Sequence, residues 1–116
     1  GIGGTVSASE VGHSYSYRAM RNDEFARFLN DAKSKTFDSD RTDFIEKAAS
    51  STGFTSEQCR RLIKLYSFDD DRTKVLKILY PSVVDKDNFS IAVDELDFLS
   101  NRSTVKDFVK NYNRTK

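Results

Sequence analysis

The pentapeptide FDSDR at residues 37–41 recurs as FDDDR at residues 68–72 and as FLSNR at residues 98–102. Each copy has Phe first, Asp or Asn fourth and Arg fifth, at offsets of 31 and then 30 residues. A period of about 30 to 34 residues is typical of arrays in which each unit is a pair of helices that buries its apolar face on the next unit. We therefore predict an all-α fold of six helices, arranged as three αα-hairpin repeats in a compact, short solenoid-like array.

Six stretches around these motifs show the 3.6-residue apolar period of amphipathic helices. The third helix has the clearest start, because Thr55 and Gln58 form a capping box beside a hydrophobic staple of Phe54 and Cys59. Pro81 must end the fourth helix near Tyr80, since proline cannot continue the hydrogen-bond ladder. The other expected helix starts are Asn22, Asp38 or Ser39, Asp69, Asp85 or Asp87, and Ser100 or Asn101. We expect helices of about 10 to 13 residues and no β-strand.

Four apolar positions in each helix are expected to face the core. They are Phe25, Phe28, Leu29 and Ala32; Phe44, Ile45, Ala48 and Ala49; Cys59, Leu62, Ile63 and Tyr66; Val75, Leu76, Ile78 and Leu79; Phe89, Ala92, Val93 and Leu96; and Val105, Phe108, Val109 and Tyr112.

Each member of the repeated motif has an expected role. We expect the Phe, at the neck of each hairpin, to fill the space between helices. The Asp beside it in the first two copies is expected to accept free backbone N–H groups. The Arg has two open interpretations, an ion pair with a nearby carboxylate or a place in a shared binding groove. The third copy has Leu99 where the others have Asp, so it is expected to deviate most.

Composition limits the possible functions. Nineteen Lys and Arg residues against eighteen Asp and Glu give a net charge of +1, so no whole-protein field favours nucleic acid. Apolar runs are far shorter than the ~20 residues of a membrane span. We expect that the chain does not bind nucleic acid and has no membrane-spanning segment. Oligomeric state is not predicted.

Residues 1–20 hold four of the five glycines and are expected to form a flexible N-terminal lead-in or linker before a helical repeat domain at 21–116. Because the chain starts without Met, we interpret it as a fragment of a secreted or multidomain protein, or its first residues as a tag remnant. No compartment is predicted.

Catalytic and metal chemistry is weakly supported. His13 lies in the lead-in and Cys59 at a staple position, so neither suits a nucleophile–base pair, and together they cannot make an ordinary zinc site. Three Asp-x-Asp pairs, at 38–40, 69–71 and 85–87, resemble the start of a calcium loop, but none has Gly at its sixth position or Glu at its twelfth. We expect no enzyme activity, no cofactor and no metal site.

Charge patterning gives the candidate binding residues. Arg102, Lys106, Lys110 and Arg114 recur every four residues on the last helix. A solvated outer face explains this stripe as well as an acidic partner does. With the repeated Arg41 and Arg72, the candidate binding residues are Arg41, Arg72, Arg102, Lys106 and Lys110.

The motif at 37–41, the Thr55–Gln58 start, Phe68–Arg72 and the DxxNF stretch at 85–89 together resemble the domain-of-unknown-function 4476 family over roughly residues 21 to 110. The resemblance implies a compact helical domain, found in bacterial and eukaryotic proteins and often one module of a longer chain. It implies no activity and no catalytic residue. We expect a non-catalytic helical module that binds a protein partner. The alternative is binding of a cation or a small polar ligand at the Asp-rich hairpin necks.

Overall fold

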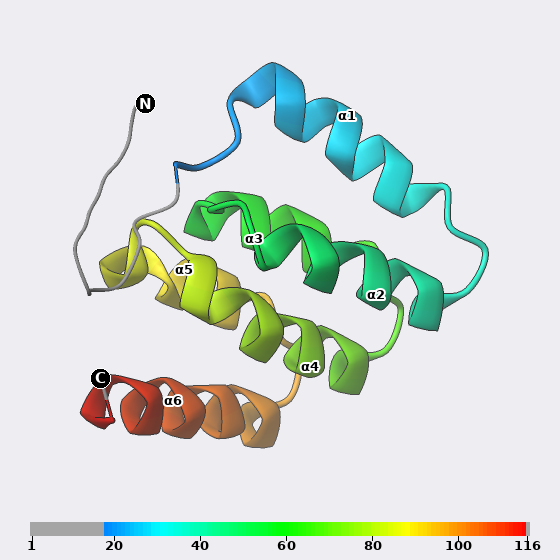
Figure 1. Ribbon diagram of the computed structural model, residues 1–116. Helices are drawn as coiled ribbons and strands as arrows, with labels where there is room; N and C mark the ends of the chain where they lie inside the picture. The colour runs from blue at the N-terminus through cyan, green and yellow to red at the C-terminus, as the bar shows by residue number, and fades with distance from the viewer. Residues whose placement is uncertain (1–17, 116) are drawn as a thin grey trace.

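The computed structural model describes residues 18–115, and within them the chain is all-helical (Figure 1). The elements are α1 (Asn22–Lys33), α2 (Asp38–Ala49), α3 (Ser56–Ile63), α4 (Asp69–Leu79), the 3₁₀ turns η2 (Tyr80–Ser82) and η3 (Lys86–Asn88), α5 (Ser90–Val93) and α6 (Leu99–Arg114). The described residues form no β-strand, only two isolated parallel bridges. The prediction of a compact all-α fold is confirmed.

Neighbouring helices belong to two sets. α1, α3 and α5 contact one another in that order, and so do α2, α4 and α6; each member of the first set also contacts the helix that follows it in the chain. The starts of α2, α4 and α6 lie on one side of the molecule, as Figure 1 shows. At the other end, the segments before α1, α3 and α5 meet through the bridges Ala19–Gly53 and Phe54–Val83. The fold therefore has two distinct ends.

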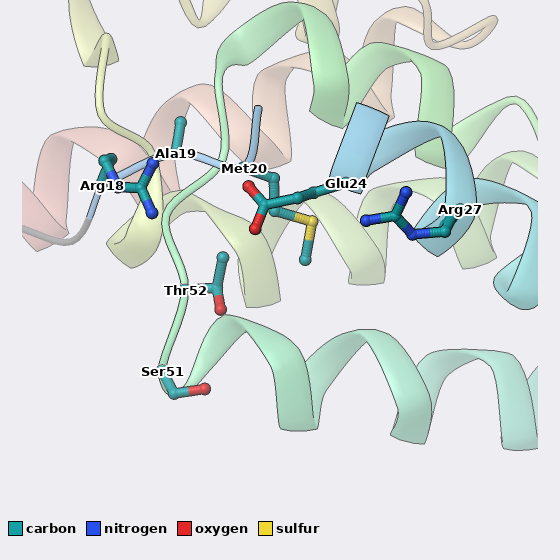
Figure 2. A pocket seen from close by; sticks show the side chains of 7 residues that line it. All are labelled: Arg18, Ala19, Met20, Glu24, Arg27, Ser51 and Thr52. Carbon is teal, nitrogen blue, oxygen red and sulfur yellow. The ribbon is translucent and has the colours of Figure 1, made fainter. Parts of the chain in front are cut away.

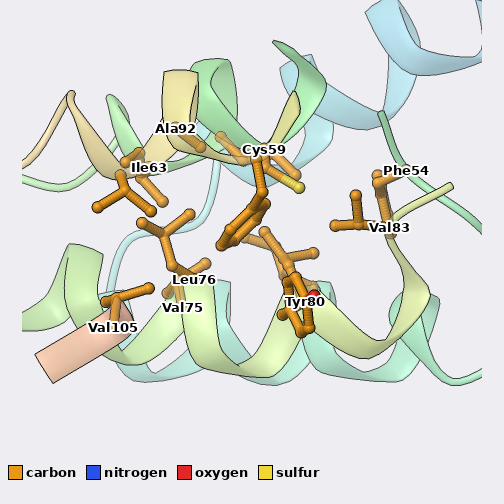
Figure 3. Close-up of a cluster of buried hydrophobic side chains, with 14 of the residues drawn as sticks. Phe54, Cys59, Ile63, Val75, Leu76, Tyr80, Val83, Ala92 and Val105 are labelled. Atoms are coloured by element: carbon orange, nitrogen blue, oxygen red, sulfur yellow. The ribbon is translucent and has the colours of Figure 1, made fainter. Parts of the chain in front are cut away.

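A single cluster of buried side chains holds the two sets together (Figure 3). The four predicted core residues of the third helix are all at most 1% exposed, and the four of the fifth helix are at most 3% exposed. In the other four helices the stripes are only partly buried; Phe28, Phe44 and Phe108, for example, pack against the cluster from its rim. Burying one such apolar side chain fully contributes roughly 1.5–3 kcal/mol, so this cluster dominates the stability of the fold.

The predicted starts at Asn22, Asp38 and Asp69 are confirmed, but several capping residues differ from the prediction. The capping box is confirmed, with Gln58 N donating to Thr55 Oγ1 and Thr55 N donating to Gln58 Oε1, both at 3.0 Å. Elsewhere the N-caps are Arg21, Phe37, Phe68 and Phe98, one or more residues before the predicted polar caps. In α2 and α4, Asp residues inside the first turn already complement the positive helix end. A polar N-cap is therefore dispensable there.

The fifth helix is much shorter than expected. Its α-helical part is four residues long, preceded by the 3₁₀ turn at Lys86–Asn88. Asp85, which was expected to cap it, instead accepts a 2.7 Å hydrogen bond from the backbone N–H of Ser56 at the start of α3. Asp85 is the N-cap residue of η3, but its side chain makes no cap hydrogen bond there and is used by α3 instead.

The expected lead-in lies mostly outside the described residues. Its last part pairs with the chain before α3: Gly53 N donates to Arg18 O at 3.2 Å, and Met20 N donates to Gly53 O at 3.3 Å. The side-chain amide of Gln58 also donates to Met20 O, at 3.0 Å. Residues 18–20 are thus tied to the start of α3.

Candidate functional site

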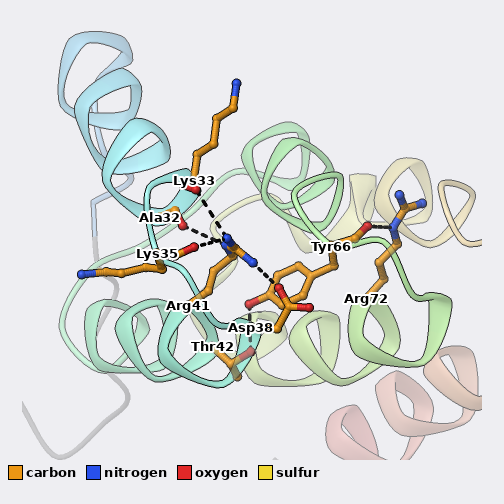
Figure 4. A network of polar contacts seen from close by, with 8 residues as sticks. All are labelled: Ala32, Lys33, Lys35, Asp38, Arg41, Thr42, Tyr66 and Arg72. Atoms are coloured by element: carbon orange, nitrogen blue, oxygen red, sulfur yellow. Dashed lines mark hydrogen bonds and ion pairs between the residues drawn. The ribbon is translucent and has the colours of Figure 1, made fainter.

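The arginine of the first motif is an internal anchor. Arg41 is 8% exposed; its Nε donates to Ala32 O at 2.8 Å, and its Nη2 donates to Lys35 O at 2.6 Å (Figure 4). It also forms an ion pair with Asp38. These carbonyls belong to the end of α1 and the turn after it, where helical partners are missing. Arg41 therefore closes the turn between α1 and α2.

The other two motif arginines make the same kind of contact. Arg72 Nε donates to Tyr66 O at 2.8 Å, in the turn after α3. Arg102 Nε donates to Leu96 O at 2.9 Å, in the turn after α5, and its Nη2 donates to Asp94 O at 3.1 Å. Within the described chain, the expected ion pair is present at Arg41 alone. The guanidinium donors face backbone carbonyls of the preceding turn, acceptors that leave no signal in the sequence.

The motif phenylalanines are exposed, so the prediction that they fill the hairpin necks is wrong. Phe37, Phe68 and Phe98 are 65%, 69% and 61% exposed. Each is an N-cap residue with an extended backbone, so its ring leaves the helix at its end rather than from the face that packs. Side chains further along, such as Ile45 and Val105, fill the interhelical space instead.

Leu99, next to Phe98, is 75% exposed. Together Phe37, Phe68, Phe98 and Leu99 form what we term the phenylalanine edge. Its members stand at the starts of α2, α4 and α6, three neighbouring helices whose starts lie on the same side in Figure 1. Single exposed apolar residues are common on protein surfaces. Three exposed phenylalanines at the starts of neighbouring helices are a stronger signal, because exposed apolar patches mark interaction sites.

A buried carboxylate fixes the spacing between the second and third phenylalanines. Asp69, beside Phe68, accepts hydrogen bonds from Asp97 N at 2.7 Å, from Phe98 N at 3.2 Å and from Asn101 Nδ2 at 2.7 Å. Burial by itself would raise the pKa of this carboxyl, but these three hydrogen bonds and the charge of Arg72 outweigh it and lower the pKa. Asp69 is therefore ionised at neutral pH and ties α4 to α6. The expected role for this Asp, accepting backbone N–H groups, holds, but the groups belong to the next turn.

A second link joins α2 to the turn before α4. Tyr66 Oη lies 2.8 Å from Thr42 Oγ1, and the guanidinium carbon of Arg41 lies 5.5 Å from the centre of the Tyr66 ring (Figure 4). Both contacts are close to Phe37 and Phe68 in the chain. The first two phenylalanines thus stand on turns that are anchored to each other.

Carboxylates surround the phenylalanine edge. Asp40 and Asp71 follow Phe37 and Phe68 by three residues and lie in the first turns of α2 and α4. Asp40, Asp70 and Asp97 are exposed, and Asp71 is half-buried. Each motif arginine uses at least one of its nitrogens on a backbone carbonyl, whereas the exposed carboxylates beside the edge are directed to solvent.

The predicted binding residues separate into two groups. Arg41, Arg72 and Arg102 are anchors under the phenylalanine edge, buried or half-buried. Lys106 and Lys110 are exposed on α6, further along the helix from the edge. Sequence reasoning missed Phe37, Phe68 and Phe98 as surface residues, although the motif itself had located them.

The described residues also border an open hollow of about 480 Å³ (Figure 2). It is lined by Arg18, Ala19, Met20, Glu24, Arg27, Ser51 and Thr52. Charges of both signs meet there, since the Glu24 carboxylate lies between the two arginines in Figure 2. No sequence pattern indicates this hollow, because its lining residues come from the predicted lead-in, α1 and the segment after α2.

The single cysteine and the first Asp of each Asp-x-Asp pair are engaged in the fold, and His13 lies outside the described residues. Cys59 is fully buried, and burial raises the pKa of its thiol, which keeps it protonated and unreactive. Asp38 forms an ion pair with Arg41, and the carboxylates of Asp69 and Asp85 accept hydrogen bonds from backbone N–H groups. Among residues 18–115, no group of three or more His, Cys, Asp or Glu side chains is placed to hold a metal ion. In the same range no helix is long and apolar enough to cross a membrane.

Comparison with known families gives one match. A family model described as "Domain of unknown function (DUF4476)" matches residues 19–109, most of the chain. Neither the curated proteins nor the solved structures contain a significant match.

Proposed function

We propose that this chain, which belongs to the DUF4476 family, is a non-catalytic helical module that binds other proteins through its phenylalanine edge. The observation that carries the proposal is the exposure of Phe37, Phe68 and Phe98 at equivalent positions on three neighbouring helices. Exposed aromatic rings of this kind are the side chains most enriched at the centres of protein interfaces.

The proposal includes a repeat architecture, in which α1–α2, α3–α4 and α5–α6 are three αα-hairpins. Two regularities support it. Each motif Arg donates to a carbonyl in the turn between the two helices of its pair. Each motif Phe is an N-cap residue with φ between −111° and −96°. In arrays of this kind, equivalent positions of successive units line one continuous surface, which is where partners commonly bind.

The anchored turns support a binding role for the exposed rings. Each ring stands on a turn whose backbone is held by an arginine, and Asp69 and Tyr66 cross-link neighbouring turns. A partner that covers the edge therefore orders little new backbone. Preorganisation of this sort raises affinity by lowering the entropic cost of binding.

The test is selection of binding peptides from a random displayed library on the immobilised domain, followed by titration calorimetry with the selected peptides. We expect peptides whose affinity falls at least tenfold when Phe68→Ser and Phe98→Ser are combined. Val84→Ser is the matched control, because Val84 is 47% exposed but follows the far end of α4. It should leave affinity unchanged.

The outcome against the proposal is equally definite. Peptides that bind the double variant and the wild-type domain equally well would show that the phenylalanine edge is not the binding surface. Melting curves of the variants serve as the folding control, since replacing exposed rings should leave the fold intact.

A further inference from the structure

Four aromatic rings in the described part of the chain have a Lys or Arg side chain over them, and none of the three motif phenylalanines is among these four. Lys35 Nζ lies 4.5 Å from the Phe44 ring centre, and Arg61 lies 5.2 Å from that of Phe25. Tyr66 and Tyr80 are covered in the same way by Arg41 and Lys86. Within residues 18–115, no Lys or Arg lies over Phe37, Phe68 or Phe98. Their π-faces are open to a cation from another molecule.

The charges beside these rings match such a cation. The three motifs carry five aspartates and three arginines, and the arginines are bonded to carbonyls of the preceding turns. No hydrogen bond or ion pair in the described part of the chain involves the carboxylates of Asp40, Asp71 or Asp97. An aromatic face beside a free carboxylate suits Arg in particular, because its planar guanidinium can stack on the ring and donate to the carboxylate together.

We infer that the partner of the phenylalanine edge is a basic, extended protein segment with Arg or Lys side chains placed over successive phenylalanines. This inference rests on the proposed function and specifies its partner. Packed helices lie about 8–10 Å apart, and a chain in the extended polyproline II conformation advances about 3.1 Å per residue and presents every third side chain on the same face. About three residues of the partner therefore span from one ring to the next, which predicts a cationic residue at every third position.

The experiment starts from the peptides selected on the wild-type domain and removes those that also bind the Phe68→Ser/Phe98→Ser variant. The sequences of the remaining peptides give their charge. We expect enrichment of Arg and Lys at a spacing of three. A synthetic copy of the best peptide is then titrated at low and high salt against the wild-type domain, the Asp40→Asn/Asp71→Asn variant and the control Asp107→Asn. Asp107 is an exposed carboxylate on α6, away from the edge.

Affinity for the Asp40→Asn/Asp71→Asn variant should be roughly three- to tenfold weaker at low salt, where screening is least. High salt should shrink this difference, and Asp107→Asn should behave like the wild type. Replacing each Arg of the peptide by Gln should abolish the difference between the domain variants.

Three results would overturn the inference. Phe-dependent peptides that are neutral or acidic, or that ignore Asp40→Asn/Asp71→Asn, would refute the basic partner and leave the proposed function standing. Concentration-dependent self-association of the domain that is lost in Phe68→Ser/Phe98→Ser would identify a second copy as the occupant. A library that yields no Phe-dependent peptide would refute both the inference and the proposed function.

Discussion

Replacing Phe68 by Ala gives the sharpest test of the exposed position of the motif phenylalanines. Phe68 is 69% exposed, so only about a third of its surface is covered in the folded protein. Full burial of a Phe side chain contributes roughly 1.5–3 kcal/mol, so the covered third contributes about 0.5–1 kcal/mol. The Phe68 side chain makes no capping hydrogen bond in the described structure, so the substitution removes none. We therefore expect Phe68→Ala to lower the free energy of unfolding by no more than about 1 kcal/mol.

Phe25→Ala is the matched comparison. Phe25 is 1% exposed in the core cluster, and removal of a fully buried Phe costs about 3–5 kcal/mol. Urea unfolding at neutral pH, followed by circular dichroism, measures both variants against the wild-type domain, with the slope of the transition as a check on two-state behaviour. A loss of 3 kcal/mol or more for Phe68→Ala would mean that the ring is buried at the hairpin neck, and the phenylalanine edge would not exist.

Further predictions concern the anchors beneath the edge. Arg41→Met keeps the aliphatic length but removes the donors, so it should cost about 1.5–3 kcal/mol in urea unfolding; an unchanged stability would refute its role as an anchor. Asp69→Asn should cost a similar amount at pH 7. Because folding lowers the pKa of Asp69, its contribution is complete above the usual unfolded value near 3.9 and is lost as pH falls through the folded pKa. The gap between wild type and Asp69→Asn should therefore narrow in acid, and a constant gap would contradict this. Cys59 should react with a thiol reagent only as fast as the domain unfolds; rapid reaction of the native protein would show an accessible thiolate. Calcium should leave the melting temperature unchanged, because no group of three or more acidic side chains among the described residues is placed to hold a cation; a rise would indicate a cation site.

The sequence was sufficient where local signals and burial agree. Thr55 and Gln58 have one obvious use together, and the structure has that capping box. Pro81 lies just past the end of α4, as its missing N–H requires. The all-helical fold followed from periodicity, which reflects the same apolar burial that holds the core together.

The site was harder to predict, because its contacts are between segments distant in the chain. Asp69 and Asp85 are typical capping residues, yet they serve the turn before α6 and the start of α3, about 28 and 29 residues away. Nothing local distinguishes these uses. Phe68 shows the opposite error: a large apolar residue is normally expected inside, but an N-cap position directs it outward. The repeat placed the three phenylalanines at equivalent positions, but the expectation that they are buried was wrong.

The central claim is that the phenylalanine edge is where a protein partner binds, and amide chemical-shift mapping by NMR tests it most directly. The labelled domain is titrated with a peptide selected for binding to it. We predict that the perturbed amides cluster in residues 35–41, 66–72 and 96–102, around the three motif phenylalanines. Perturbations centred on the hollow beside Arg18 and Arg27, or along Lys106 and Lys110 of α6, would contradict the account.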